Sequence, residues 1–331
     1  MASLLLGDQE GENHKFDTSI RYHKSKIMTC LLMIRPVAFG LNLQTVGSNA
    51  FQNKNAKQQN VQENALAEFD SFVAKLKAAH IDVTVIDDTL TPHTPDSIFP
   101  NNWVSFHNDG SVFLYPMQAQ NRRLERRTDI LDKLGKRFNI TQINDLSSFE
   151  NQNQYLEGTG SMVLDRENKL AYACISNRTH PQVLEIFCAE SGYQALTFSA
   201  FDSNNLPIYH TNVLMCIAEK FVVICLDTII SESEKNKLIA SFKATKKEVI
   251  EISLMQMNHF AGNMLEVKNN EGENYLIMSE AAFTSLTDLQ KVQIKPYSQI
   301  LYSNLQTIEE NGGGSARCML AEVCLPLKVN I

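Results

Sequence analysis

Hydrophobic and polar positions follow two alternating periods in a fixed order along this chain. After Asn102, two runs with the two-residue period of strands precede a run with the period of an amphipathic helix, and one more strand-like run follows. The first unit reads WVSFHNDGSVFLYP, then RRLERRTDILDKLGKR, then FNITQIN, and its Asn-Asp-Gly segment is typical of a hairpin turn. The pattern predicts a strand–strand–helix–strand unit.

The same order of elements recurs three more times. The later units begin near Ser161, Asn212 and Asn263, and the last two of these positions are 51 residues apart. A half-unit remains at each end of the chain: TCLLMIRP, a long helical run and IDVTVID at the front, and CMLAEVCLPL at the back. If the two end strands pair, five equal units close into a ring, which leaves no exposed sheet edge. We expect one domain over residues 28–331.

Composition narrows the possible partners. The chain has 331 residues, of which 44% are hydrophobic and 20% charged, and its formal net charge is −7. Because no large positive surface is available to pair with phosphates, a small-molecule partner is expected rather than a nucleic acid. No stretch approaches the eighteen apolar residues of a membrane span, and residues 1–27 lack the pattern of a secretory signal, so they are expected to be a disordered tail.

The seven cysteines point to a reducing compartment. Their number is odd and they are scattered through apolar runs, as expected of reduced thiols in a cytoplasmic protein. No cysteine and histidine cluster has the spacing of metal ligands, so no metal and no cofactor are expected. A homodimer is left open.

Chemically useful side chains occur just before the first strand of each unit. In a closed ring these positions lie at the same height near the centre. They hold Asn102, Glu157, His210, Asn212, Asn263 and Cys318. A base, a carboxylate and a thiol would then converge from three units, with the thiol delivered by the glycine-rich loop NGGGSARC.

These motifs carry a family resemblance. The segments PDSIFPNNW, LEGTGSMV, SNRTH, YHTNV and GGGSARCM resemble the guanidine-modifying, or pentein, superfamily. The chain looks most similar to the citrulline-utilisation hydrolases within it, and also resembles dimethylarginine dimethylaminohydrolases and arginine deiminases. The resemblance extends from about Met28 to the C-terminus. It implies an α/β fold, a five-bladed α/β propeller of pseudo-fivefold units with a central substrate channel.

The resemblance also assigns catalytic roles. It places the nucleophile on Cys318, the general acid and base on His210, and the carboxylate that orients the histidine on Glu157. A resonance-stabilised guanidinium or ureido carbon needs a thiolate for attack, and a nearby cation and base favour the thiolate. We therefore expect Arg317 to support the thiolate of Cys318.

The substrate-binding positions include departures from the family pattern. The residues expected to contact substrate are Asp96, Asn101, Asn102, Arg122, Arg178, Asn212, Asn263 and Arg317. The resemblance assigns the substrate carboxylate to Arg122 and Arg178. Asn102 and Asn212 stand at positions where the relatives have carboxylates. An amide can donate a hydrogen bond to a ureido oxygen, whereas a carboxylate cannot. This favours a neutral ureido substrate such as citrulline, which would be hydrolysed to ornithine, ammonia and carbon dioxide.

Other functions stay open. Asp96 and Glu157 would suit a guanidinium, so arginine deiminase, dimethylarginine-hydrolase-like or amidinotransferase activity is the alternative. A pentein binding scaffold without catalysis is the non-enzyme alternative, and a redox thiol protein would need a second cysteine near Cys318. Some of these residues could instead have purely structural roles. The run RRLERR is typical of a solvated helix face, and Asn263 could serve only to fix the start of its strand by hydrogen bonds from its side chain to the backbone.

Overall fold

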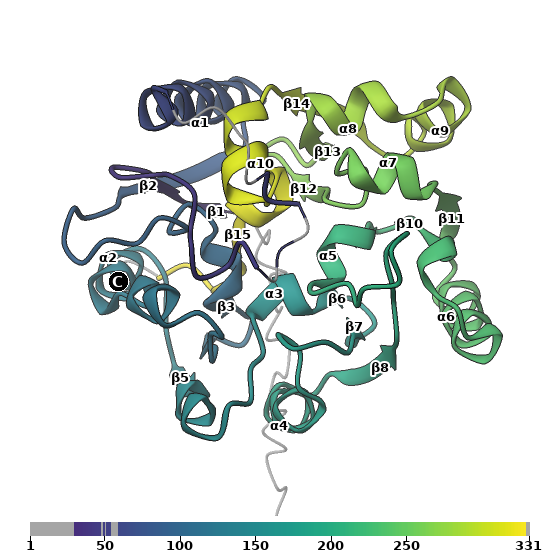
Figure 1. Cartoon of the computed structure of the whole chain (residues 1–331), viewed down its shortest axis with the longest axis horizontal. Coiled ribbons are helices and arrows are strands. Elements are labelled where there is room, and N and C mark those ends of the chain that lie inside the picture. Colours follow the sequence, from purple (N-terminus) through teal and green to yellow (C-terminus); the bar gives the residue numbers. More distant parts are fainter. Residues whose placement is uncertain (1–29, 48, 50, 54–58, 329–331) are drawn as a thin grey trace, which may run out of the picture.

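The computed structural model describes residues 30–47, 49, 51–53 and 59–328, and in this part of the chain five three-stranded sheets are arranged around a common centre (Figure 1). The predicted tail at residues 1–27 lies outside the described residues. The sheets consist of β15 (Ala321–Val323), β1 (Cys30–Arg35) and β2 (Asp82–Asp87); β3 (Val104–Phe106), β4 (Ser111–Leu114) and β5 (Gln142–Asp145); β6 (Val163–Asp165), β7 (Leu170–Cys174) and β8 (Gln194–Phe198); β9 (Met215–Ile217), β10 (Phe221–Ile224) and β11 (Glu248–Glu251); and β12 (Leu265–Lys268), β13 (Asn274–Ser279) and β14 (Gln299–Ser303).

Every sheet has the same pairing pattern. The first two strands are antiparallel and the third is parallel to the central one, as in β3–β4 and β4–β5. A hairpin suffices for the antiparallel pair, whereas the parallel strand needs a crossover, which a helix supplies. The predicted strand–strand–helix–strand unit and the α/β class are therefore confirmed.

The crossover helices lie outside the sheets (Figure 1). The helices are α1 (Val61–Ala78), α2 (Thr128–Gly135), α4 (Pro181–Ser191), α6 (Glu232–Ala244), α8 (Glu280–Ser285) and α9 (Asp288–Ile294). In α1, Ala65, Phe69, Phe72 and Leu76 recur at helical spacing, are buried, and share a core cluster with Leu31 of β1. Burial of such a stripe stabilises a helix more than its intrinsic propensity does.

The two end strands of the chain lie in one sheet. β1 pairs with β15 in antiparallel register, with Cys30 opposite Val323 and Leu32 opposite Ala321, and with β2 in parallel register on its other side. The first strand is thus the central strand of a sheet that the last strand completes.

Short helices precede the first strands and face the centre. They are the 3-10 helix η1 (Pro100–Asn102), α3 (Gly158–Ser161), α5 (Thr211–Leu214) and the 3-10 helix η5 (Ala316–Met319). In the remaining sheet, α7 (Leu254–Asn258) ends five residues ahead of Asn263, and β12 begins two residues after Asn263. The starts of the units are therefore the positions from which side chains can converge.

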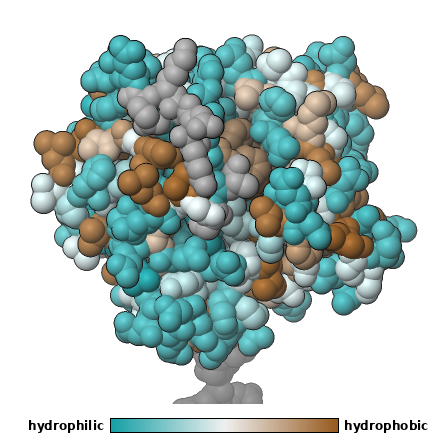
Figure 2. Space-filling model, viewed as in Figure 1, coloured by the Kyte–Doolittle hydropathy of each residue, from teal (hydrophilic) through white to brown (hydrophobic). Residues whose placement is uncertain are grey.

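Other short elements complete the fold. They are the 3-10 helices η2 (Gln120–Glu125), η3 (Ser147–Gln152) and η4 (Leu226–Thr228), and the helix α10 (Gln306–Gly312). Figure 2 shows that the face seen in Figure 1 is largely hydrophilic, with hydrophobic residues in small separate groups. None of the helices described has the length and apolarity needed to cross a membrane.

Candidate active site

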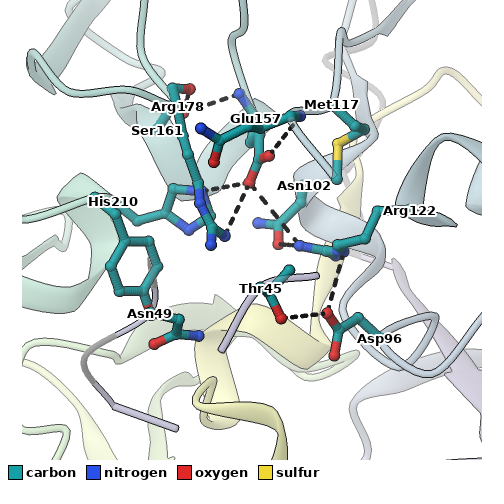
Figure 3. Close-up of polar contacts among 12 residues, drawn as sticks. Thr45, Asn49, Asp96, Asn102, Met117, Arg122, Glu157, Ser161, Arg178 and His210 are labelled. Atoms are coloured by element: carbon teal, nitrogen blue, oxygen red, sulfur yellow. Dashed lines mark hydrogen bonds and ion pairs between the residues drawn. The ribbon is translucent and has the colours of Figure 1, made fainter. Parts of the chain in front are cut away.

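Residues from four separate units line one small cavity. Cys318 of η5 and His210, which precedes α5, share it with Asp96, Arg122 and other groups. The full lining is Thr45, Asn49, Asp96, Phe99, Asn102, Arg122, Arg178, Tyr209, His210, Gly312, Gly313, Gly314 and Cys318. The cavity has a volume of about 20 Å³, which is room for about one water molecule. Glu157 lies behind this surface, at the centre of the polar contacts in Figure 3.

His210 and Glu157 form a buried pair. Nε2 of His210 lies 2.8 Å from Oε2 of Glu157, and both residues are at most 3% exposed. Burial lowers the pKa of His210 to about 4 in spite of the carboxylate, and nearby Arg178 adds to this effect. Burial alone would raise the pKa of Glu157, but Arg178, His210 and Arg122 outweigh it and hold that pKa well below its usual range. At neutral pH a neutral imidazole therefore faces an ionised carboxylate.

The thiol of Cys318 accepts two hydrogen bonds from amides. The side-chain nitrogens of Asn212 and Asn263 lie 3.3 and 3.2 Å from Sγ. Asn263 is fixed in turn, because its Nδ2 donates to the Asn212 carbonyl at 3.0 Å and its Oδ1 accepts the Arg317 backbone N–H at 3.0 Å. N–H donors stabilise a thiolate more than a thiol. The structure thus places both asparagines at the sulfur.

The three glycines before Cys318 pack where no side chain fits. A Cβ on Gly312 or Gly314 would lie 2.7 or 2.8 Å from the Phe99 ring. Gly313 has φ +64°, and a Cβ there would lie 2.5 Å from the Asn49 side chain. The glycine run therefore lets the backbone approach the segments that cover the cavity.

Arg122 is buried and held by protein groups. Its Nε and Nη2 donate to the two oxygens of Glu125 at 2.9 and 3.0 Å, and its Nη1 donates to Oδ1 of Asn102 at 2.9 Å. The expectation of a solvated helix face for RRLERR is wrong at these positions, because Arg122 and Glu125 are both 3% exposed. Glu125 was not predicted from the sequence. Because the guanidinium of Arg122 already donates hydrogen bonds to Glu125 and Asn102, it is not free to bind a substrate carboxylate.

Arg178 lies between this cavity and a larger one. Its guanidinium stacks on Tyr209 at 4.8 Å from the ring centroid, and its Nη1 donates to Glu157 at 3.4 Å. Both residues also line a neighbouring cavity of about 700 Å³, together with Phe51 and Phe260. Arg178 is buried, and its position suits contact with the distal end of a ligand.

Arg317 is placed away from the predicted site. Its Nη1 donates to the Leu320 carbonyl at 2.7 Å and its Nη2 to Glu322 at 3.3 Å. The side chain lines a different cavity, with Asp165 and Lys247. Adjacent residues of a 3-10 helix point about 120° apart, so Cys318 and Arg317 face different cavities, and the expected substrate contact of Arg317 is corrected.

Asp96 and Asn102 line the small cavity, and Asn101 contacts Asn102. Nδ2 of Asn102 donates to Oδ1 of Asn101 at 3.0 Å. Oδ2 of Asp96 accepts from Asn42 at 2.7 Å and from Thr45 at 3.4 Å. Asn42 and Thr45 come from the segment between β1 and α1, which the sequence reasoning missed because it has no hydrophobic period.

Several buried side-chain atoms of the described residues have no hydrogen-bond partner, and three of these atoms belong to residues that the sequence predicts to contact substrate. They are Oδ1 of Asp96, Nδ2 of Asn101 and Oδ1 of Asn212. Buried polar atoms are normally satisfied, so such atoms at a site are where a ligand would bind. The described residues contain no group of three or more side chains suited to a metal ion.

The chain resembles known proteins over most of its length. A sequence profile described as N,N dimethylarginine dimethylhydrolase, eukaryotic, matches residues 35–325. No curated protein matches significantly. The apo structure of ArgZ, an arginine dihydrolase from the ornithine-ammonia cycle in Cyanobacteria, is 15% identical with a TM-score of 0.71, and the match covers 92% of this chain and 42% of ArgZ.

Two further solved structures match over nearly their whole length. The N-terminal domain of ArgZ bound to product is 16% identical with a TM-score of 0.72, covering 90% of this chain and 98% of that domain. DDAH from Pseudomonas aeruginosa complexed with citrulline is 14% identical with a TM-score of 0.63, covering 89% and 99%. At these identities the likeness shows a shared fold. The chain spans about two-fifths of full-length ArgZ.

Proposed function

Because the chain belongs to the family described as N,N dimethylarginine dimethylhydrolase, eukaryotic, we propose that it is a cysteine-dependent hydrolase that cleaves the ureido group of citrulline. The family is named for a hydrolase of an arginine derivative, in agreement with the enzyme class expected from the sequence. The products would be ornithine, ammonia and carbon dioxide.

The observation that carries the proposal is the arrangement around Cys318. Its sulfur accepts from two amides, and it shares a cavity with His210, which is 2.8 Å from Glu157. This is a nucleophile, a base and a group that orients the base. A protein that only binds has no need of the three together.

The chemistry follows from the protonation states. Neutral His210 takes the proton of Cys318, and Glu157 stabilises the resulting imidazolium. The thiolate attacks the ureido carbon, the bond from this carbon to the terminal nitrogen breaks, and His210 returns the proton so that ammonia leaves. His210 then deprotonates water, which displaces the sulfur, and the released carbamate separates into ornithine and carbon dioxide.

The unpartnered polar atoms support a ureido ligand. Nδ2 of Asn101 can donate to a ureido oxygen, and Oδ1 of Asn212 can accept from a ureido N–H. The rest of the ligand would extend past Arg178 toward the larger cavity.

We further propose that the five sheets form one closed, five-bladed propeller and a single catalytic domain. The pairing of β1 with β15 and the convergence of the short helices support this proposal. In such a ring the cavity lies in the central channel.

Hydrolysis of arginine is the second candidate. The buried carboxylates Asp96 and Glu157 favour it, because they could compensate a guanidinium. The described similarity to an arginine dihydrolase is consistent with it as well.

The test is product analysis with purified protein given citrulline, arginine and methylated arginines in parallel. Ornithine and ammonia from citrulline are expected, with loss in Cys318→Ala and retention in Cys188→Ala, which changes a partly buried free cysteine of α4. Faster turnover of arginine than of citrulline would overturn the assignment of substrate. No turnover of any substrate would favour a binding scaffold.

A further inference from the structure

A group of buried charges surrounds the cavity. Three carboxylates, Asp96, Glu125 and Glu157, lie with the guanidinium groups of Arg122 and Arg178, and all five residues are at most 3% exposed. Arg122 is the common partner. Its nitrogens lie 3.7 Å from Asp96 and 3.9 Å from Glu157 (Figure 3), and its Nε lies 2.9 Å from Glu125. With every carboxylate ionised, this group carries one negative charge more than positive.

Asp96 is the least compensated of the three carboxylates. Glu125 has both oxygens on Arg122, and Glu157 has His210 and Arg178. Asp96 has two neutral donors on Oδ2, from Asn42 and Thr45. Its Oδ1 is buried without a partner among the described residues, while the Nε that lies nearest to Oδ2 donates to Glu125. A buried carboxylate in such a place takes up a proton easily.

The direction of the pKa shifts agrees with this geometry. Burial raises the pKa of Asp96, although Arg122 and Arg178 oppose the effect. Burial acts on the pKa of Glu125 in the same direction, but the attraction of Arg122 opposes it. The bidentate contact with Arg122 nevertheless identifies Glu125 as the carboxylate that stays ionised, which leaves the proton to Asp96.

We propose that Asp96 holds a proton when the cavity binds a neutral ureido ligand and releases this proton to solvent when the cavity binds a guanidinium ligand. This inference rests on the proposed function of the cavity. With Asp96 protonated, the negative charges of the two other carboxylates balance the positive charges of the two guanidinium groups. The carboxyl O–H of Asp96 then donates to a ureido oxygen. With Asp96 ionised, the extra negative charge pairs with the ligand guanidinium, and Oδ1 accepts its N–H.

The consequence is a choice of ligand that depends on pH. Raising the pH ionises Asp96, so the affinity for citrulline falls while the affinity for arginine rises. Other groups that face Asp96 do not reverse this trend. The guanidinium groups near Asp96 carry a fixed charge. Glu125 is held ionised by its two hydrogen bonds from Arg122, Glu157 stays ionised, and His210, with a pKa of about 4, stays neutral between pH 6 and pH 8.

The test is calorimetric titration of the inactive Cys318→Ala protein with citrulline and with arginine. Each titration is repeated in two buffers of different ionisation enthalpy, which counts the protons exchanged. Removal of the thiol also removes its own titration. Arginine is expected to release up to one proton per site between pH 6 and pH 7, and citrulline to release none.

Variants of Asp96 sharpen the result. Asp96→Asn in the Cys318→Ala background is expected to bind citrulline within about threefold of the parent, to bind arginine at least tenfold more weakly, and to release no proton. Asp129→Asn, at an exposed carboxylate paired with Arg127 and Lys133, should change neither ligand. If Asp96→Asn fails to fold, the proton count of the parent still decides.

Each outcome has a clear meaning. Equal proton exchange with both ligands would overturn the inference, and release that persists in Asp96→Asn would assign it to Glu125 instead. If proton release by arginine is found in a protein that does not hydrolyse citrulline, the inference stands while the proposed substrate fails. If neither ligand binds, both fall.

Discussion

At the scale of single residues, asparagine side chains make the contacts to Cys318 and Arg122 in the candidate active site, where charged side chains would be expected. Asn212 and Asn263 donate to the sulfur of Cys318, and Asn102 accepts from Arg122. A hydrogen bond to a charged group contributes about 1.5–3 kcal/mol. The two amides at the sulfur, Asn212 and Asn263, are therefore each able to stabilise the thiolate measurably.

Asn212→Ala is therefore expected to slow alkylation of Cys318 at neutral pH. Loss of one N–H donor destabilises the thiolate by about 1.5–3 kcal/mol, so the alkylation rate at neutral pH should fall by about tenfold or more. The measurement is the rate of iodoacetamide labelling at Cys318 at about pH 7, followed by peptide mass spectrometry. Asn204→Ala, in the loop that lines the larger cavity, is the control. An unchanged rate would mean that the amide serves only to position the loop.

The proposed catalytic residues could be singled out from the sequence for a physical reason. Cys318, His210 and Glu157 stand at equivalent positions of a repeat, which the hydrophobic period reveals. Glu125 was missed because charged runs are usually solvated, although its spacing of three from Arg122 was a signal of pairing. Arg317 was misplaced because neighbours in sequence need not share a face.

At the scale of elements, α10 and the loop after it fix the position of Cys318, the proposed nucleophile. Glu309 of α10 accepts the Ser315 hydroxyl at 2.5 Å, and the Ser315 carbonyl accepts the Cys318 N–H at 3.0 Å. Burial raises the pKa of Glu309 to about 7, with Ser315 and Ser279 opposing the shift. The carboxyl is therefore favoured in its protonated form in the folded protein.

Stability should fall as pH rises through the pKa of Glu309. Because this pKa is raised on folding, its contribution is fully present below the unfolded value of about 4.5 and is lost as pH rises through about 7. The loss is on the order of 3 kcal/mol for a shift of this size. Urea unfolding at pH 5 and pH 8 measures it.

Glu309→Gln separates this effect from other titrations. The variant should lose most of the difference in unfolding free energy between the two pH values. Glu280→Gln, an exposed carboxylate at the start of α8, should keep the difference. A wild-type-like slope in Glu309→Gln would show that other groups cause it.

At the scale of the whole molecule, the order of helices and strands could be predicted from the sequence. The position of the loop between β1 and α1, which lies beside the cavity, could not. Each unit has its own helical and strand periods, so the sheets were found from the pattern. The segment between β1 and α1 supplies Asn42 and Thr45 to Asp96, yet no period marks it. Contacts of this kind depend on tertiary packing, which a single sequence does not encode locally.

The sheet of β1 and β15 joins the two ends of the chain, so its core should be critical for stability. Leu32 is fully buried opposite Ala321. Leu32→Ala is expected to lower the unfolding free energy by about 2–5 kcal/mol. Leu289→Ala, at a side chain of α9 that is 70% exposed, should have little effect. Equal urea midpoints for the two variants would contradict a structural role for this sheet.

The most direct test of the central claim is to trap the covalent intermediate on Cys318. Protein mixed with citrulline labelled at the ureido carbon is quenched with acid during turnover, and its peptides are analysed by mass spectrometry. The account predicts the label, with the citrulline skeleton less ammonia, on the peptide that contains Cys318, and none in Cys318→Ser. Ornithine formed without label on this peptide, or label on another cysteine, would contradict it.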